Sequence, residues 1–374
     1  MASSFVVIGS GIAGASVFFA LARRGAGVTL VDDGAVGQAT AASAGIIQPW
    51  SSSVEGPFYE VYAAGAAYYP ELLSLLAEAG VTRTDYRRSG ALLVNADAWA
   101  LDAVQERLET RRARAGEAMG RVERIGNQRA RELFPPLAEG VDAVFIEGGG
   151  RVDGRTMRDA LLEAGKRCGG VVMSGHATLE APSAATVDSR RLIADAVVVA
   201  GGAWSAGLLG ALGVAVPVVP QRGQITQLRV AGHDTSGWPS VHPLSHHYLV
   251  AFDHGRVAVG ATREVGTGFD PRVTAAGQLQ VLNDALSVAP GLADATLIET
   301  RVGLRPLAED AMPLVGAVRR HPGLFIATGY GAAGLTMGPL LGDALARTML
   351  GEHVALLDAI APRIGSGRRS QGNQ

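Results

Sequence analysis

The residues with the most informative spacing are three glycines near the N-terminus. They form the pattern Gly9-x-Gly11-x-x-Gly14 directly after the apolar run Phe5–Ile8. Glycine at these spacings permits a tight turn, a close approach of the backbone to a phosphate, and close packing of a helix on a strand. The chemistry that this pattern predicts is binding of a dinucleotide pyrophosphate at the N-terminus of a helix.

The surrounding sequence predicts the elements that such a site needs. A helix is expected from about Ala13 to Arg23 and a second strand over Val28–Val31. Asp32 ends that strand, where its carboxylate would accept hydrogen bonds from a ribose. A secretory signal that ends at Ala20-Leu21-Ala22 is the alternative. It is disfavoured because no basic residue precedes the apolar run and because it leaves the glycine spacing unexplained.

A second glycine-rich segment, Gly329-Tyr-Gly-Ala-Ala-Gly-Leu-Thr336, lies near the other end of the chain. A plain strand-to-helix turn is the alternative for this segment taken alone. The two segments together indicate a flavin that is held at both of its ends.

Composition excludes several other classes of protein. The chain has 374 residues, 48% of them hydrophobic, and a formal net charge of −2. A chain of this kind buries a large core and is expected to form two domains, with no basic surface for nucleic acid. No apolar run is long enough to span a membrane. Cys168 is the only cysteine, so no intramolecular disulfide forms, which fits a cytoplasmic location. No cluster of ligands suggests a metal.

The pattern of apolar residues predicts an α/β fold with a second, antiparallel sheet. Helices and buried strands alternate over the first 205 residues, which is typical of a parallel sheet wound by helices. From about Pro217 short alternating strands replace them. The helices expected are 58–79, 98–114, 155–167, 274–288 and one that ends near Leu350; the strands expected are 91–94, 170–173, 196–200, 224–228, 248–252, 256–260 and 324–327.

In several motifs the chain resembles the D-amino-acid oxidase family of FAD-dependent flavoproteins, and within it the glycine oxidase and sarcosine oxidase-like members. Besides the glycine segments, the matching pieces are Thr40–Ile47, Ala196–Ser205, Pro220–Gln224, Val259–Thr262, Val302–Asp310 and Pro313–Gly316. The resemblance covers nearly the whole chain. It implies a Rossmann-like FAD domain of residues 1–82, 146–217 and 302–364, interleaved with a substrate domain of residues 83–145 and 218–301. Residues 365–374 are expected to form a disordered tail.

The resemblance also implies which residues contact FAD. They are Gly9, Gly11, Ile12, Ala13 and Gly14 at the pyrophosphate, Asp32 and Asp33 at the adenosine, Thr40, Ala41, Ala44, Gly45 and Ile46 along the ribityl chain, Thr178 at the adenine, Gly202, and Tyr330, Gly331, Ala332, Ala333, Gly334, Leu335 and Thr336 at the pyrimidine edge. Sarcosine oxidase-like relatives attach FAD to a cysteine near the segment Gly303–Pro306. This chain has no cysteine there, so noncovalent binding is expected.

Two residues carry the catalytic expectation. Arg305 matches the arginine that binds the substrate carboxylate in the family, a task that suits the planar guanidinium. A structural ion pair with Glu309 or Asp310 is the alternative. Tyr248 matches a tyrosine whose hydroxyl lies over the flavin, and a core tyrosine is the alternative. His246 and His247 adjoin Tyr248 on the expected strand, where alternation would send them to opposite faces.

Two departures from glycine oxidase bear on the substrate. Ala332 stands where that enzyme has a second arginine, and Arg263 stands where it has an apolar residue that lines the pocket. The hypothesis is a substrate larger than glycine, such as an N-substituted glycine whose second acidic group reaches Arg263. The alternative is a surface arginine that pairs with Glu264 or another acid.

The reaction implied by the resemblance is FAD-dependent oxidation of an amine next to a carboxylate. The product is an imine that water hydrolyses to an oxo acid and an amine, while O2 is reduced to H2O2. A quinone-linked D-amino-acid dehydrogenase shares the same motifs and is the first alternative. A catalytically silent dinucleotide-binding protein is the second.

Overall fold

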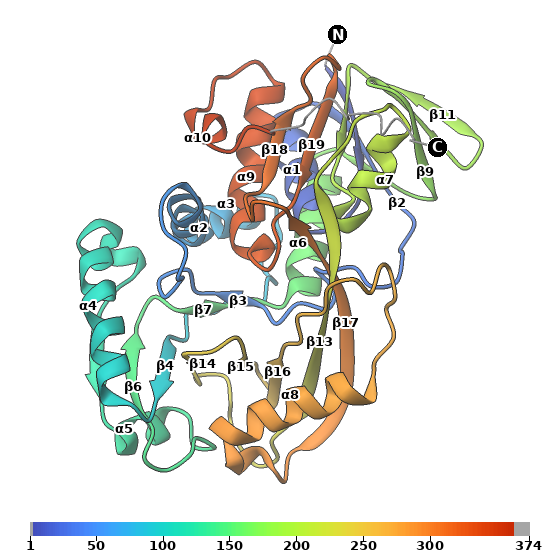
Figure 1. The fold of residues 1–374 in the computed structure, drawn as a ribbon. Helices are drawn as coiled ribbons and strands as arrows, with labels where there is room; N and C mark the ends of the chain where they lie inside the picture. The colour runs from blue at the N-terminus through green and yellow to red at the C-terminus, as the bar shows by residue number, and fades with distance from the viewer. Residues whose placement is uncertain (1–2, 363–374) are drawn as a thin grey trace, which may run out of the picture.

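The computed structural model describes residues 3–362, and Figure 1 shows their arrangement. The tail expected over residues 365–374 lies outside this range. One part of the molecule is built on a six-stranded sheet with the order β18-β19-β12-β1-β2-β8, parallel except for the edge strand β18. Its strands are β1 (Ser4–Ile8), β2 (Gly27–Asp32), β8 (Val171–Ser174), β12 (Ala196–Val199), β18 (Leu314–Ala317) and β19 (Leu324–Thr328).

Both faces of this sheet are covered, which is why its strands read as continuous apolar runs. In β1, Phe5 and Val7 pack against helices, whereas Val6 and Ile8 face the other side. The helices are α1 (Ile12–Ala22), α6 (Gly154–Arg167) and α9 (Gly334–Met349). The other face carries the meander β9 (Ala177–Ala181), β10 (Ala184–Val187) and β11 (Arg190–Ile193), with the short helices η2 (Gly202–Trp204) and α7 (Ser205–Gly210).

The second sheet has eight strands in the order β17-β13-β16-β15-β14-β4-β6-β5, antiparallel except for the pair β14 and β4. They are β17 (Thr296–Ala308), β13 (Val218–Arg229), β16 (Arg256–Gly260), β15 (Tyr248–Ala251), β14 (Ser240–Pro243), β4 (Ala91–Asn95), β6 (Asp142–Ile146) and β5 (Val122–Ile125). Leu92 faces α5 (Asn127–Leu133) and α8 (Ala275–Val288) on one side of this sheet. Leu93 faces α4 (Ala98–Ala115) on the other.

The strands β13 and β17 connect the two parts of the molecule (Figure 1). They pair along their whole length, from Val218 opposite Ala308 to Arg229 opposite Thr296. The end of this ribbon reaches the first sheet, where Leu307 bridges to Tyr330 and Leu304 bridges to Gln38. The domain boundary expected at residue 302 falls inside β17, so the division of the chain into the two stated domains stays a prediction.

The remaining elements fill the space between and around the sheets. They are β3 (Ile46–Ile47), β7 (Gly150–Arg151), α2 (Pro57–Ala67), α3 (Tyr69–Glu78), α10 (Ala355–Asp358), η1 (Gly116–Ala118) and η3 (Pro290–Leu292). The single helix expected over residues 58–79 is two helices. The break falls at Tyr68, and Pro70 is the second residue of α3, because proline cannot continue a preceding helix without losing a hydrogen bond. The predicted fold class, α/β with an interleaved antiparallel sheet, is confirmed. None of the described helices is long and apolar enough to cross a membrane.

The contact between α1 and β1 generates a test of the glycine pattern. A Cβ added at Gly14 would lie 1.9 Å from the carbonyl oxygen of Gly9, so the helix would have to move. We expect Gly14→Ala to lower the free energy of unfolding by about 1–3 kcal/mol, as overpacked sites do. Urea denaturation measures this change. Gly210→Ala is the matched control, because a Cβ there meets nothing within 4 Å; equal effects of the two substitutions would contradict the argument.

Candidate active site

A cavity of about 1140 Å³ lies between the first sheet and the inner face of the second. Parallel strands of an α/β sheet present their ligand site beyond their carboxyl ends, and the segments that follow β1, β2, β8, β12 and β19 all line this cavity. Most of the predicted cofactor positions line it: Gly9, Gly11, Ile12, Ala13, Asp32, Asp33, Thr40, Ala44, Gly45, Ile46, Thr178, Gly202, Tyr330, Gly331, Ala332, Gly334 and Leu335.

Four predicted cofactor positions, Gly14, Ala41, Ala333 and Thr336, do not line the cavity. Gly14 lies behind the glycine loop against Gly9. Thr336 holds the wall instead, because its hydroxyl donates to the carbonyl oxygen of Ile46 (3.3 Å). These positions therefore shape the site from behind rather than from its surface.

The glycine loop is fixed by side chains from the next turns. The N–H of Ile12, at the start of α1, donates to Oγ1 of Thr40 (3.0 Å). The N–H of Ser10 donates to Oδ2 of Asp32 (2.6 Å), which ties the loop to the end of β2. Asp33 contacts Nδ1 of His176 (2.9 Å), and this hydrogen bond is the main reason why the pKa of the Asp33 carboxyl lies below its usual range. His176 follows β8 and was not predicted, since no motif marks it.

The lining fits an elongated dinucleotide such as FAD. An added Cβ at Gly202 or Gly331, both at positive φ, would project into open space with no atom within 4 Å. The hydroxyl of Tyr330 is buried and has no hydrogen-bond partner among the described residues. Backbone can therefore approach a ligand closely at these points, and a buried donor is available beside them.

The predicted carboxylate-binding arginine lies on the long ribbon. Nη1 of Arg305 donates to the carbonyl oxygen of Thr262 (3.0 Å) and to Oε1 of Gln221 (3.3 Å). Its guanidinium lies over the backbone of Gly223, where an added Cβ would be 2.4 Å from Nη2. Within residues 3–362 Arg305 forms no ion pair, so the alternative pairing with Glu309 or Asp310 is not observed.

Tyr248 and Arg263 line the cavity beside Arg305. Tyr248 begins β15 and pairs with Gly260 of β16, and Arg263 follows three residues after Gly260. Burial raises the pKa of the Tyr248 hydroxyl, and the two arginines oppose that shift only in part. Partial burial and the nearby charge of Arg305 lower the pKa of Arg263. Arg263 has no acidic partner in the described part of the chain, and Glu264 pairs elsewhere.

The expectation that at most one of His246 and His247 shares a face with the site is wrong. Both line the cavity, because they lie in the bend before β15 and not on the strand where alternation would separate them. His242 of β14 lines it too, and burial lowers the pKa of His242 to about 4. Burial also lowers the pKa of His247. Among the residues described, no group of three or more His, Cys, Asp or Glu side chains is arranged to hold a metal.

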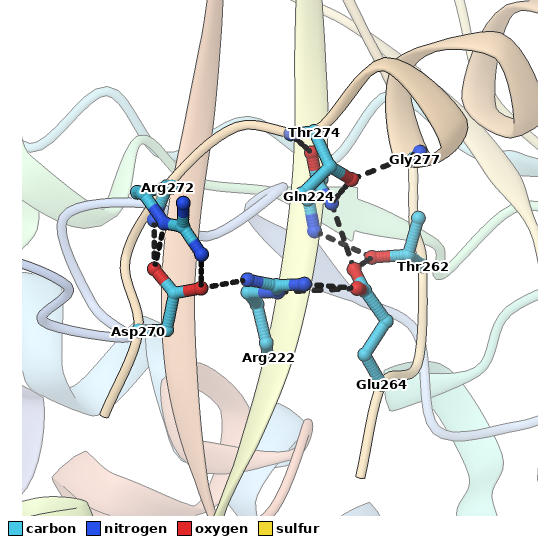
Figure 2. Close-up of polar contacts among 8 residues, drawn as sticks. All are labelled: Arg222, Gln224, Thr262, Glu264, Asp270, Arg272, Thr274 and Gly277. Carbon is cyan, nitrogen blue, oxygen red and sulfur yellow. Dashed lines mark hydrogen bonds and ion pairs between the residues drawn. The ribbon is translucent and has the colours of Figure 1, made fainter. Parts of the chain in front are cut away.

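A polar network behind the wall holds the segment that carries Arg263 (Figure 2). Nη2 of the buried Arg222 contacts Oε2 of Glu264 (2.6 Å), and its Nη1 contacts Oδ2 of Asp270 (2.8 Å). Oε1 of Glu264 accepts from Gln224 (2.8 Å) and from the hydroxyl of Thr262 (2.7 Å). Thr262 therefore connects this network to the cavity, because its hydroxyl donates to Glu264 and its carbonyl oxygen accepts from Arg305.

The same network reaches the start of α8. Oε1 of Gln224 accepts from the N–H of Thr274 (3.0 Å), and the Thr274 hydroxyl caps the helix by accepting from the N–H of Gly277 (3.1 Å). Asp270 is also held by Arg272 (2.9 Å). The segment between β16 and α8 is therefore anchored at both ends and in its middle.

The fold and the cavity are those of a flavoprotein oxidoreductase. The chain belongs to the FAD-dependent oxidoreductase family known as DAO, whose family model matches residues 4–348. The family resemblance inferred from the sequence motifs is confirmed, and FAD is the cofactor of this family.

Three comparisons describe the chain's place within the family. It is 43% identical to the uncharacterized oxidoreductase YurR of Bacillus subtilis (strain 168), over 94% of this chain and 96% of that one. The crystal structure of iminodiacetate oxidase from Chelativorans sp. BNC1 is 44% identical, with a TM-score of 0.92 over 96% of this chain and 98% of that one. The glycine oxidase structure from Geobacillus kaustophilus is 26% identical, with a TM-score of 0.83 over 94% and 96%. The chain is thus a glycine oxidase-like enzyme of this family.

The network around Glu264 predicts a pH-dependent contribution to stability. Burial opposes ionisation of Glu264, but its hydrogen bonds with Arg222, Gln224 and Thr262 outweigh burial and lower its pKa. A carboxyl with a lowered folded-state pKa stabilises the fold above its unfolded pKa of about 4.3, and that stability is lost as pH falls through the folded pKa. We expect Glu264→Gln to cost about 1–3 kcal/mol at pH 7 and progressively less below about pH 4.

Urea unfolding of both proteins across this pH range measures the difference. The exposed Glu309→Gln is the control, with an expected change within about 0.5 kcal/mol. A cost of Glu264→Gln that stays constant from pH 7 to pH 3 would show that the carboxylate charge is not what the network uses.

Proposed function

We propose that this enzyme oxidises N-carboxymethyl amines that carry a second acidic group, with iminodiacetate as the simplest example. The observation that carries the proposal is the pair Arg305 and Arg263, which line one end of the cavity beside Tyr248 with no carboxylate partner among the described residues. Arg263 is exposed and Arg305 is half-buried. Because the two neighbouring arginines repel each other, their arrangement favours a ligand with two negative charges. The 44% identity to a protein described as an iminodiacetate oxidase supports the same substrate class.

The side chains would bind and orient the substrate. The hydrogen bonds from Arg305 to Thr262 and Gln221 both use Nη1, and the guanidinium also hydrogen-bonds with the Tyr248 side chain. Arg305 would bind one substrate carboxylate through its remaining donors. Arg263 would bind the second carboxylate. Tyr248 stays protonated at neutral pH, because its pKa is raised, and it would donate to the substrate from the roof of the cavity. Positioning of this kind places the reacting carbon, which is the main task left to the protein when a cofactor accepts the electrons.

FAD, held by the glycine loop and by the turn from Tyr330 to Leu335, would supply the electron acceptor. The substrate amine loses two electrons and two protons to become an imine, and water then hydrolyses the imine to an oxo acid and the shortened amine. With O2 as final acceptor the second product is H2O2. Cys168 caps the end of α6 and does not line the cavity, which supports noncovalent binding of FAD.

The reaction class has a direct test. Purified holoenzyme mixed with iminodiacetate without oxygen should lose its flavin absorbance near 450 nm, and sarcosine should bleach it more slowly. Glycine, D-alanine and D-proline are the comparison substrates. Readmitted air should restore the colour within the turnover time; a flavin that stays reduced in air and is reoxidised by a quinone would identify a dehydrogenase instead. No bleaching by any N-carboxymethyl amine would reject the proposal.

Substitutions of Arg305 and of Arg263 should have different effects on substrate selectivity. We expect Arg305→Ala to lower kcat/KM about a hundredfold for every substrate, which corresponds to about 2–3 kcal/mol for a charged hydrogen-bonded contact. Arg263→Met should lower kcat/KM for iminodiacetate by a similar factor and for sarcosine by less than about threefold. Steady-state kinetics on both substrates check this. An equal relative loss for Arg263→Met on the two substrates would place Arg263 outside the substrate contacts.

A further inference from the structure

Two arginines one turn apart on α4 have very different surroundings. Arg111 is buried, and both of its terminal nitrogens are committed: Nη1 donates to the carbonyl oxygens of Trp50 (2.6 Å) and Ser52 (2.7 Å), and Nη2 pairs with Glu55. Its guanidinium also lies over the ring of Tyr59, and only its Nε has no partner among the described residues. Arg111 therefore fixes the segment between β3 and α2. That structural task is complete without help from the rest of α4.

Arg107, by contrast, has no structural partner. It lies on the face of α4 that lines the cavity, together with Val104. Its Nε is buried without a hydrogen-bond partner, and no ion pair involves Arg107 within residues 3–362. Burial and the adjacent charge of Arg111 lower its pKa, while Glu55, the acid that opposes this shift, is committed to Arg111. The charge of Arg107 therefore has no counter-ion among the residues that the structure describes.

The surroundings of Arg107 form a polar extension of the same cavity. The lining on this side includes Gln48, the three serines Ser51–Ser53, and His242 of β14. Leu93 of β4 forms its floor, since α4 packs against β4 and β6. The extension is therefore roomy and supplies hydrogen-bond donors around the guanidinium, which suits a ligand oxygen.

Arg107 and the Arg305–Arg263 pair lie at opposite ends of the cavity. Arg305 is on β17, the edge strand of the second sheet, and Arg263 follows β16. Helix α4 packs against β4, β5 and β6 toward the other edge of that sheet (Figure 1). Five strand spacings separate β17 from β4 and three separate β16 from β4, which corresponds to about 24 Å and about 14 Å across the sheet between backbones. A ligand that contacts both ends must be an elongated molecule with a negative charge at each end.

We propose that Arg107 forms a distal subsite for a carboxylate, so that the pocket accepts N-carboxymethyl amines with a long acidic arm in addition to short dicarboxylates. The arm runs along the inner face of β15, β14 and β4, and its terminal carboxylate binds the guanidinium of Arg107. This subsite extends the proposed function, because the amine to be oxidised is held at Arg305 as before. Its ligand class is an elongated dianion, and its binding needs no chemical step.

Because binding alone defines the subsite, inert dicarboxylates test it. Holoenzyme is titrated with succinate, suberate and sebacate, and the change in flavin absorbance gives each Kd. Suberate or sebacate should bind wild-type enzyme more tightly than succinate. Arg107→Gln should weaken the longer ligand by about tenfold to a hundredfold, the worth of a charged hydrogen bond, and change succinate by less than about twofold.

Two further variants separate the subsite from other effects. Arg107→Lys keeps the charge and should retain most of the affinity for the longer ligand. Arg112→Gln removes an exposed arginine of the same helix, which pairs with Glu109 (3.3 Å), and should change no Kd. If Arg107→Gln raises the Kd of short and long ligands by the same factor, Arg107 acts only through its long-range charge. That result would overturn the subsite. Wild-type enzyme that binds the long ligands no better than succinate would overturn it too.

Kinetics then distinguish this proposal from the proposed function. The kcat/KM values for iminodiacetate and for N-carboxymethyl-6-aminohexanoate are compared in wild type and Arg107→Gln, and only the latter substrate should lose activity. An enzyme that oxidises neither amine rejects the proposed function, while the dicarboxylate titration still decides the subsite. If the enzyme oxidises both amines, and the ratio of their kcat/KM values is the same in wild type and in Arg107→Gln, the proposed function stands and the subsite is rejected.

Discussion

The pairing of β13 with β17 is the constraint on which the rest of the site depends. These strands place Arg305 on the second sheet only two residues from Leu307, which bridges to Tyr330 of the glycine-rich turn after β19. The N–H of Gly331 also donates to the carbonyl oxygen of Pro306 (2.9 Å). The spacing between the proposed carboxylate site and this turn is therefore fixed by backbone hydrogen bonds and not by side-chain packing. Ordered backbone provides the precision that a reacting pair of molecules requires.

The charged residues around the cavity fall into two groups, those that pair with each other and those that face the cavity without a partner. Three acidic residues near the cavity are committed to structural arginines: Glu264 and Asp270 to Arg222, and Glu55 to Arg111. Asp32 and Asp33, which line the cavity, instead accept from the Ser10 N–H and contact His176. The arginines that line the cavity keep no acidic partner in the described chain. Partly buried cations without counter-ions cost stability, and such groups gather where a protein binds charged ligands. Neutral, buried His242 adds hydrogen-bonding capacity to the wall without adding to this positive charge.

The sequence predicted what depends on neighbouring residues. The glycine spacing, the five parallel strands of the first sheet and the apolar periodicity of α6 and α8 are local features. The edge strand β18 was not expected, and the role of Arg305, which lies in a recognisable motif, stays a prediction. The sequence did not predict β5, β6, β14 or α5, whose segments are short and whose apolar residues are explained only by α5 packing on the sheet. Nothing in the local sequence marks Arg107, because the many charges of α4 are typical of a solvated helix face. Its place in the cavity follows from how α4 packs on β4, which no local pattern contains. His246 and His247 were misjudged because the strand was expected to have begun before them.

The order of strands in the first sheet has a consequence for how the chain folds during synthesis. Its central strand β1 pairs with β12, so that Phe5 lies opposite Ala196, and β12 pairs in turn with β19. During synthesis, β1 can therefore pair with β12 only after nearly two hundred further residues have been added to the chain. Contacts between such distant parts of a chain slow folding and leave apolar strand edges exposed meanwhile. In the interleaved architecture the first sheet is complete only when almost the entire polypeptide has been synthesised. The N-terminal part therefore does not fold rapidly on its own.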